Sequence, residues 1–136
     1  MIIPAVFDTN VIISGALFGG SPRELLQAVI DHRIRLFISD EMITELMEVL
    51  QRPKFKTRGP LNSLLIAQLL ELATKINSSR NEAIELRDKD DHIVIDCAIA
   101  AKAEYIVTGD LDFVSYGRLA GIAIVTPAEM LRVIQD

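Results

Sequence analysis

The chain of 136 residues contains one cysteine, two histidines and no tryptophan. A single cysteine excludes an internal disulfide, and the scarcity of cysteine and histidine argues against the ligand sets of a usual zinc site. Cys97 lies in the apolar stretch of residues 93–101, where we expect a small core residue rather than a nucleophile. These absences are consistent with a protein of the reducing cytoplasm.

Long apolar runs are also lacking, and none reaches the length of a membrane span. Residues 1–8 have neither a basic stretch nor a cleavage site of small residues, so we expect a first strand there rather than a signal peptide. Half of the residues (50%) are hydrophobic, which is enough for one ordinary core in a chain of this length. We therefore expect residues 1–136 to form a single domain.

Positive charge is scarce, since the formal net charge is −5. This balance argues against nucleic-acid binding through a global positive field. Between Glu48 and Glu71, however, the chain contains no acid. The cations of this segment are Arg52, Lys54, Lys56 and Arg58. The segment is either a solvated loop or a local patch that contacts phosphates, and Arg23 and Arg118 are further candidates for such contacts.

Short apolar runs rich in valine and isoleucine predict strands of a parallel sheet that is covered on both faces. They lie at residues 2–7, 34–38, 105–107 and 122–125, with a weaker candidate at 82–86. Helical patterns separate them, at residues 21–32 (Ser21 as the N-cap), 40–52 (Ser39 or Asp40 as the N-cap), 61–76, 91–103 and 126–134. This alternation predicts an α/β fold, a three-layer sandwich with a four- or five-stranded parallel sheet.

Aspartates occur at the ends of these predicted elements. Asp8 closes the first strand, Asp110 and Asp112 follow the third, and Asp91 opens the most apolar helix. In an open parallel sheet the ligand site lies beyond the carboxyl ends of the strands, so we expect these side chains to meet at one edge. Because bare like charges repel, such a group must hold a cation or take up protons.

Glu45 is assigned to the same group by a helical-wheel argument. At about 100° per residue, Met42 and Val49 lie on the apolar arc of their helix, and Glu45 lies at the margin of that arc. Glu41 and Glu48 lie on the opposite side. Of the three glutamates, Glu45 is therefore the best placed to reach around the edge of the core.

Each of these acids also has an ordinary structural interpretation. Asp8 could form a turn or an N-cap, Asp91 could cap its helix, and Asp110 with Asp112 could form a turn. Glu45 could be a boundary residue that extends into water. Each alternative is reasonable alone, but four separate elements that all place an acid at one predicted edge favour a shared site.

Residues beside the acids could assist them. Asn10 and Ser14 could orient Asp8 or contact a phosphate, and Thr108 could donate a hydrogen bond to a carboxylate of the site. His92 could act as a base, although it has no second histidine beside it. Asp88 and Asp90 are interpreted as loop charges or as groups that support the ligands, and the role of Asp96 stays open.

Oxygen ligands without paired His or Cys favour Mg²⁺ or Mn²⁺ over Zn²⁺. A group of carboxylates around such an ion can acidify a bound water and stabilise charge on a phosphate. The residues thus indicate a metal-dependent hydrolase. A phosphatase of the haloacid-dehalogenase type would need Asp at position 10, where the chain has Asn10, and a receiver domain would need Lys after its last strand, where the chain has Thr126-Pro127.

The order and spacing of five short motifs resemble those of PIN-domain ribonucleases over essentially the whole chain. The motifs are residues 6–11 (VFDTNV), 44–46 (TEL), 52–55 (RPKF), 87–92 (RDKDDH) and 107–113 (VTGDLDF). The resemblance is to the branch of toxins in toxin–antitoxin systems, similar to VapC. The family's acidic quartet would fall on Asp8, Glu45, Asp91 and Asp110, with Asp112 as a frequent fifth member. The family usually has Asn after the third acid, where this chain has His92.

The resemblance implies an endoribonuclease that uses Mg²⁺ or Mn²⁺ held by the quartet. It also implies a small antitoxin that covers the acidic cleft, and a homodimer. The leucine-rich residues 61–72 could supply the interface or belong to the core, and we favour the core. The alternative function is a PIN-like module that binds metal or RNA without turnover.

Overall fold

The computed structural model describes residues 1–52 and 60–135. The strands are β1 (Ile3–Phe7), β2 (Ile34–Ser39), β3 (Thr74–Ile76), β4 (Tyr105–Val107), β5 (Arg118–Leu119) and β6 (Ile122–Val125). The helices are α1 (Thr9–Leu17), α2 (Gly20–Ile30), α3 (Asp40–Leu50), α5 (Pro60–Leu72), α6 (Lys89–Ala101), α7 (Leu111–Val114) and α8 (Pro127–Gln135).

The strands form one sheet in the order β3-β2-β1-β4-β6-β5. β1, β2, β3, β4 and β6 run parallel, and only the two-residue strand β5 is antiparallel. From β1 the chain first builds the sheet outward through β2 and β3, and then returns to the other side of β1 for β4. The switch point of strand order, where ligands bind in such sheets, therefore lies between β1 and β4.

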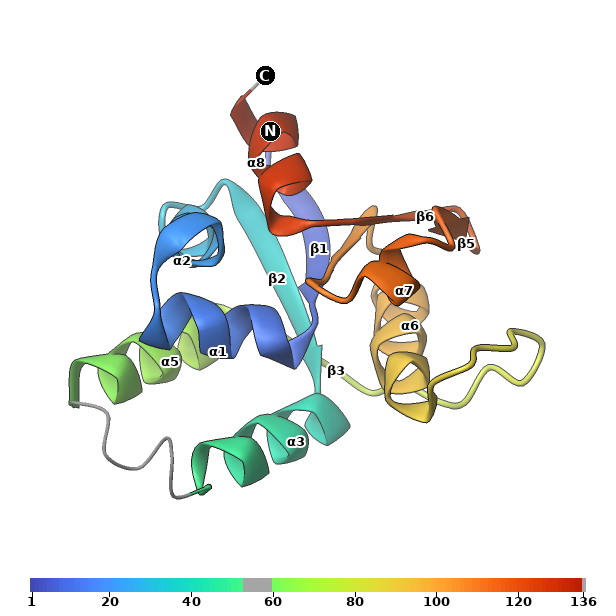
Figure 1. Ribbon diagram of the computed structural model, residues 1–136, viewed down its shortest axis with the longest axis horizontal. Helices are drawn as coiled ribbons and strands as arrows, with labels where there is room; N and C mark the ends of the chain where they lie inside the picture. Colours follow the sequence, from blue (N-terminus) through green and yellow to red (C-terminus); the bar gives the residue numbers. More distant parts are fainter. Residues whose placement is uncertain (53–59, 136) are drawn as a thin grey trace.

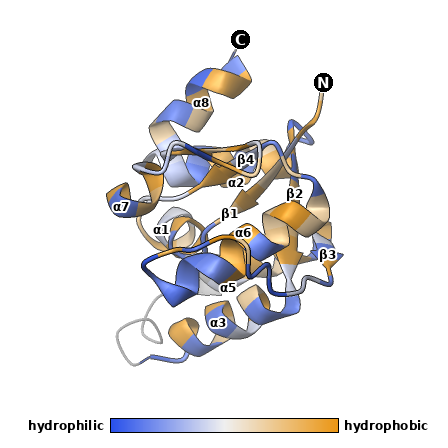
Figure 2. Ribbon diagram, turned by 90° about the vertical axis from the view of Figure 1, so that its right-hand side faces the viewer, coloured by the Kyte–Doolittle hydropathy of each residue, from blue (hydrophilic) through white to orange (hydrophobic). Residues whose placement is uncertain are grey.

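Helices cover both faces of the sheet, which confirms the predicted three-layer α/β sandwich. α1, α2 and α5 lie on one side, and α6 lies on the other and contacts β1, β2, β3 and β4 (Figure 1). In Figure 2 the central strands β1 and β2 are hydrophobic, whereas α8 alternates between hydrophobic and hydrophilic residues along its length. This pattern is expected when a sheet is buried between layers and a helix has one face in water.

The strands predicted at residues 105–107 and 122–125 are confirmed with the same bounds, and those at 2–7 and 34–38 differ by one residue at one end. The weak candidate at 82–86 is wrong, because residues 82–84 form a turn and a bend and residues 85–86 have no regular structure. The further parallel strand is β3, in a stretch whose pattern predicts the end of a helix. α5 instead ends at Leu72. β3 has only three residues, and its middle residue is Lys75, so the sequence has no apolar run there that would predict a strand.

The predicted helix starts are corrected at two places. α2 begins at Gly20 with Gly19 as its N-cap, so Ser21 is not the cap. α6 begins at Lys89 with Asp88 as its N-cap, two residues before the predicted start at Asp91. The predicted cap Ser39 is confirmed for α3, where its hydroxyl accepts a hydrogen bond from the main-chain N–H of Met42 at 3.3 Å.

Helix α1, which the sequence pattern does not predict, follows β1 without a loop. Six of its nine residues are buried, so it shows no polar face that would reveal a helical period. Gly15 lies where α1 packs on α2, and a Cβ there would come within 2.8 Å of Leu26 Cδ1 and 3.0 Å of the main-chain carbon of Pro22. The close approach of the two helices therefore depends on glycine.

We expect Gly15→Ala to lower the free energy of unfolding by about 1–3 kcal/mol, because the added methyl group forces α2 away from α1. The matched control is Gly109→Ala, since a Cβ at Gly109 meets nothing within 4 Å. Urea denaturation of both variants measures the difference. Equal stability of the two variants would contradict the packing described.

None of the described helices is both long and apolar enough to cross a membrane. The leucine-rich helix α5 packs on α1 and α2, with Ile66 and Leu69 buried. Leu64 and Leu72 on the same helix are exposed, with 66% and 42% of their surface accessible. Helix α5 thus contributes to the core, as favoured from the sequence, while its outer face stays free for contacts that the structure does not define.

Candidate active site

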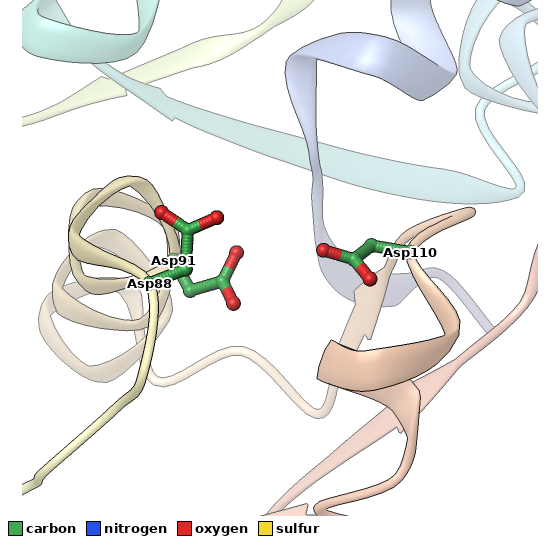
Figure 3. A group of neighbouring side chains, drawn as sticks. All are labelled: Asp88, Asp91 and Asp110. Carbon is green, nitrogen blue, oxygen red and sulfur yellow. The ribbon is translucent and has the colours of Figure 1, made fainter.

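Three carboxylates meet beyond the carboxyl end of β4. Asp88 and Asp91 come from the start of α6, and Asp110 comes from the turn between β4 and α7. Each offers an oxygen atom within 4.8 Å of the oxygens of the other two. Figure 3 shows Asp88 and Asp91 side by side on their helix, with the Asp110 carboxylate facing them across a gap. The three residues thus form a cluster of negative charge at the sheet edge predicted from the sequence.

Three aspartates at this edge cap helices as well. Asp8 Oδ1 accepts from the main-chain N–H of Asn10 at 3.4 Å, Asp88 Oδ1 from that of Asp90 at 2.9 Å, and Asp110 Oδ1 from that of Asp112 at 2.9 Å. The ordinary interpretation of Asp8 and Asp110 is therefore correct, but it leaves their second oxygens for other partners. The capping role proposed for Asp91 is wrong, since Asp88 has it. The helix starts place positive dipole ends beside the acids and offset part of their repulsion.

Thr108 joins the ends of the two central strands. Its hydroxyl donates to Asp8 Oδ2 at 2.9 Å and accepts from the main-chain N–H of Asp110 at 3.1 Å. The main-chain N–H of Asp8 in turn donates to the carbonyl of Val107 at 2.9 Å. Because Thr108 is completely buried, this bridge holds Asp8 and Asp110 in fixed positions, and the predicted hydrogen bond from Thr108 to a site carboxylate is confirmed.

We expect Thr108→Val to lower the free energy of unfolding by about 1–3 kcal/mol, because it leaves the N–H of Asp110 without its acceptor and Asp8 Oδ2 without its donor. Valine has nearly the same shape, so the loss reports the hydroxyl and not the packing. Chemical denaturation measures the change, with Thr44→Val at an exposed position of α3 as the control. A Thr108→Val protein as stable as the control would show that the bridge contributes nothing.

Asp91 is the most perturbed of these acids. Only 7% of its surface is exposed, and its pKa is raised to about 7, first by burial and then by the charges of Asp88, Asp110, Asp8 and Asp90. Near neutral pH this carboxyl therefore holds a proton for much of the time when no cation is present. A bound cation would favour its charged form.

Asp8 and Glu45 extend the acidic group toward the middle of the sheet. Burial raises the pKa of Asp8, and the charge of Asp110 raises it further, whereas the hydrogen bond from Thr108 lowers it. Burial likewise raises the pKa of Glu45, followed by the charges of Asp8 and Asp90. The Glu45 carboxylate also shares a hydrogen bond with the side chain of Thr9, next to Asp8. The structure thus brings Glu45 of α3 into electrostatic contact with the strand-end acids.

A pocket of about 400 Å³ opens over the aspartate cluster. Its walls are formed by Arg87, Asp88, Lys89, Asp91, Asp110, Asp112 and Tyr116. Asp112 is exposed on the wall, whereas Asp8 and Glu45 are not among the lining residues. The pocket therefore combines a negative floor with two cations and a phenol at its rim.

The predicted phosphate contacts lie in different places. Asn10 is exposed at the start of α1, and Ser14 lies one turn further along the same face of that helix. Arg52 is exposed just after the end of α3, the helix that carries Glu45. Lys54, Lys56 and Arg58 lie outside the described residues.

Arg23 and Arg118, the further candidates, have main-chain partners. Arg23 donates to the carbonyls of Gly15 and Ala16 at 2.7 and 2.8 Å, near the end of α1. Arg118 donates to the carbonyl of Gly121 at 3.1 Å, across the turn between β5 and β6. Both guanidinium groups are therefore engaged in holding local structure.

From the sequence, Asp88 is interpreted as a loop charge or as a group that supports the ligands, and the structure places it in the cluster with Asp91 and Asp110. Arg87 and Tyr116 are not singled out by the sequence pattern. A signal for Asp88 was present, because it lies three residues before Asp91, the spacing that places two side chains on one face of a helix. Recognising it requires the correct start of α6. The position of Tyr116 depends on the short helix α7, which has no clear sequence pattern.

Three other polar groups near α6 have different surroundings. His92 is buried, its Nδ1 has no hydrogen-bond partner among the described residues, and it lines a separate pocket with Arg80 and Ile84. Asp96, whose role was open, accepts from the main-chain N–H of Asn81 at 3.0 Å and anchors the segment before α6. Cys97 is completely buried, and burial raises its pKa to about 12, which fits an unreactive core residue.

The donor set fits a hard divalent cation. Carboxylate oxygens of Asp88, Asp91 and Asp110 converge within 4.8 Å, and all are of the type that Mg²⁺ and Mn²⁺ prefer. Burial and the neighbouring negative charges raise the pKa of Asp91, and a bound cation would offset both effects. The residues present thus satisfy the chemistry of a magnesium or manganese site.

The fold and the acidic sheet edge together define an α/β protein with a carboxylate site at the switch point. A model of the PIN domain matches residues 4–112, and the chain belongs to that family. Among solved structures, a chain of VapBC2 from Rickettsia felis, crystallised with a DNA fragment from its promoter, has the same fold. The TM-score is 0.62 at 16% identity, and the match covers 91% of this chain and 98% of that one. No curated protein matches the chain significantly.

Proposed function

We propose that this protein is a metal-dependent endoribonuclease that hydrolyses phosphodiester bonds of RNA. The observation that carries the proposal is the convergence of Asp88, Asp91 and Asp110 within 4.8 Å at the switch point of the sheet. Asp8, fixed by Thr108, and Glu45 add charge behind the cluster. Membership of the PIN domain family supports the same conclusion.

In this mechanism a bound Mg²⁺ or Mn²⁺ would supply positive charge to the phosphate and make a nearby water more acidic. Asp91 and Asp110 would hold the ion directly, with Asp8 and Glu45 completing the acidic quartet and Asp88 as an additional ligand. Thr108 keeps Asp8 Oδ2 oriented, so the carboxylate does not have to rearrange as the reaction proceeds. Asp112, on the pocket wall, would position the attacking water through its carboxylate.

We further propose that the enzyme is the toxin of a toxin–antitoxin pair in the cytoplasm. The similar Rickettsia felis structure is a VapBC2 complex bound to promoter DNA. The acidic pocket is open on the surface, so a small antitoxin that presents a cation could cover it. A homodimer is part of the proposal, with the exposed Leu64 of α5 as one apolar residue available for an interface.

The test is incubation of purified, antitoxin-free protein with a mixed RNA pool in Mg²⁺ or Mn²⁺, with EDTA as the control. The proposal predicts cuts at defined sites that disappear in EDTA. Absence of cleavage by protein shown to be folded would contradict it and favour the alternative, a PIN-like module that binds metal or RNA without turnover.

A further inference from the structure

The rim of the acidic pocket contains an ordered arginine that the acidic quartet does not involve. Arg87 immediately precedes Asp88, the N-cap of α6, and Tyr116 lies just beyond α7. Both residues line the same pocket as Asp91 and Asp110. Two segments far apart in the sequence therefore place a guanidinium and a phenol beside the carboxylates.

Tyr116 holds Arg87 in three ways. Its hydroxyl oxygen accepts from the main-chain N–H of Arg87 at 3.2 Å and from Nε at 3.3 Å. The guanidinium carbon also lies 5.4 Å from the centroid of the tyrosine ring, within the range of a cation–π interaction. The ring meets Phe113 edge to face, with centroids 6.4 Å apart at 84°, and Phe113 is completely buried. The arginine is thus fixed to the core through an aromatic pair.

This arrangement leaves the outer part of the guanidinium available. In the part of the chain that the structure describes, Tyr116 is the only hydrogen-bond partner of the Arg87 side chain, and its contact uses Nε. The charge of Asp112 also acts on the guanidinium, without a hydrogen bond. The terminal nitrogens are then free to donate to another group. Arg87 is also exposed, so a ligand in the pocket can reach it. An oriented guanidinium with two free terminal nitrogens matches the oxygens of a phosphate.

We propose that Arg87 binds a phosphodiester of the RNA substrate beside the carboxylate cluster, and that Tyr116 is the positioning residue that orients its guanidinium. The inference rests on the proposed ribonuclease function, because the cluster supplies the reason for a phosphate to occupy the pocket. The overall charge of −5 makes a local cation beside the cluster more important, since the chain as a whole has no net positive field to attract RNA.

The experiment compares Arg87→Ala, Arg87→Lys and Tyr116→Phe with the parent. The matched control is Arg35→Ala, since Arg35 also lies over an aromatic ring, 6.0 Å from the centroid of Phe37, but lines a different pocket. For the binding measurements, each change is combined with Asp91→Asn, so that a fluorescent single-stranded RNA stays intact. For the cleavage kinetics, each change is made in the protein that retains Asp91. Thermal melts of all variants exclude unfolding.

We expect Arg87→Ala to weaken RNA binding about tenfold. The slope of the logarithm of the binding constant against the logarithm of salt concentration should fall by about one, the value for one lost phosphate contact. Arg35→Ala changes the net charge by the same amount and should have little effect on either quantity. Arg87→Lys should recover only part of the binding, because lysine lacks the planar fork. Tyr116→Phe should weaken binding several-fold, and this loss should vanish when Arg87 is already alanine. If Tyr116 had only a structural role, Tyr116→Phe would weaken RNA binding equally whether residue 87 is arginine or alanine.

Binding and salt dependence equal to those of the parent in Arg87→Ala would overturn the inference. This failure is distinct from a failure of the proposed function. If the parent does not cleave RNA in any metal, the ribonuclease proposal fails, yet the binding comparison still decides whether Arg87 contacts phosphate. If the parent cleaves and Arg87→Ala cleaves and binds as well as the parent does, only the role of Arg87 is wrong.

Discussion

Asp91→Asn is expected to reduce metal-dependent RNA cleavage by at least about 100-fold while leaving the protein folded. Asp91 is the most buried acid of the cluster and the one whose pKa is raised the furthest, to about 7. Asparagine keeps the shape but removes the charge and one of the two equivalent oxygens. The substitution thereby removes a proposed metal ligand without forming a cavity.

Steady-state cleavage of a defined RNA, measured over a range of Mn²⁺ concentrations, tests this expectation. The control is Asp31→Asn, which has the same charge change at an exposed aspartate just after α2 that is not among the residues lining the pocket. Cleavage by the Asp91→Asn protein at the parent rate would remove Asp91 from the proposed site. A loss that excess Mn²⁺ fully restores would assign Asp91 to metal affinity alone.

The second large effect concerns stability and pH in the absence of metal. The folded-state pKa of Asp91 is about 7, against an ordinary value of 3.8 in the unfolded chain. Between these values the folded protein retains a proton that the unfolded chain has released. The contribution of Asp91 to stability should therefore be fully present below about pH 4, be lost as the pH rises through about 7, and be absent above that range. The raised pKa values of Asp8 and Glu45 act in the same direction.

We expect Asp91→Asn to flatten this decline and to stabilise the metal-free protein at pH 8 by about 1–3 kcal/mol, because it removes a buried like charge. Mg²⁺ or Mn²⁺ should stabilise the parent at pH 8 and should stabilise the variant much less. Urea denaturation of both proteins at pH 5 and pH 8, with EDTA or with metal, gives the four values required for each. A parent whose stability does not decrease across this range would show that the acids are not mutually repulsive.

The sequence was sufficient to predict the strands that carry the site. Residues 105–107 form a short apolar run with an aspartate soon after it, and residues 2–7 form another that ends directly before Asp8. Parallel pairing of these strands places both carboxylates at one edge, as their side-by-side register in the sheet confirms. Periodicity and the rule for switch points were therefore enough to place Asp8 and Asp110.

The parts that were missed depend on tertiary contacts. α1 is apolar on nearly all sides, so it has no helical period to detect, and its β-branched residues suit a strand as well as a helix. β3 is a three-residue edge strand that is stabilised by pairing with β2 rather than by its own sequence. Asp88 was not placed among the candidate ligands from the sequence, because the run 87–91 does not show which acids face the pocket until the start of α6 is known.

The most direct test of the central claim is a crystal structure of the protein with Mn²⁺, using anomalous scattering to locate the ion. The account predicts an anomalous peak between the start of α6 and the β4–α7 turn, about 2.0–2.4 Å from carboxylate oxygens of Asp91 and Asp110. The same peak should be absent in crystals of Asp91→Asn. Crystals of the parent soaked at high Mn²⁺ that show no peak at this cluster would contradict the account.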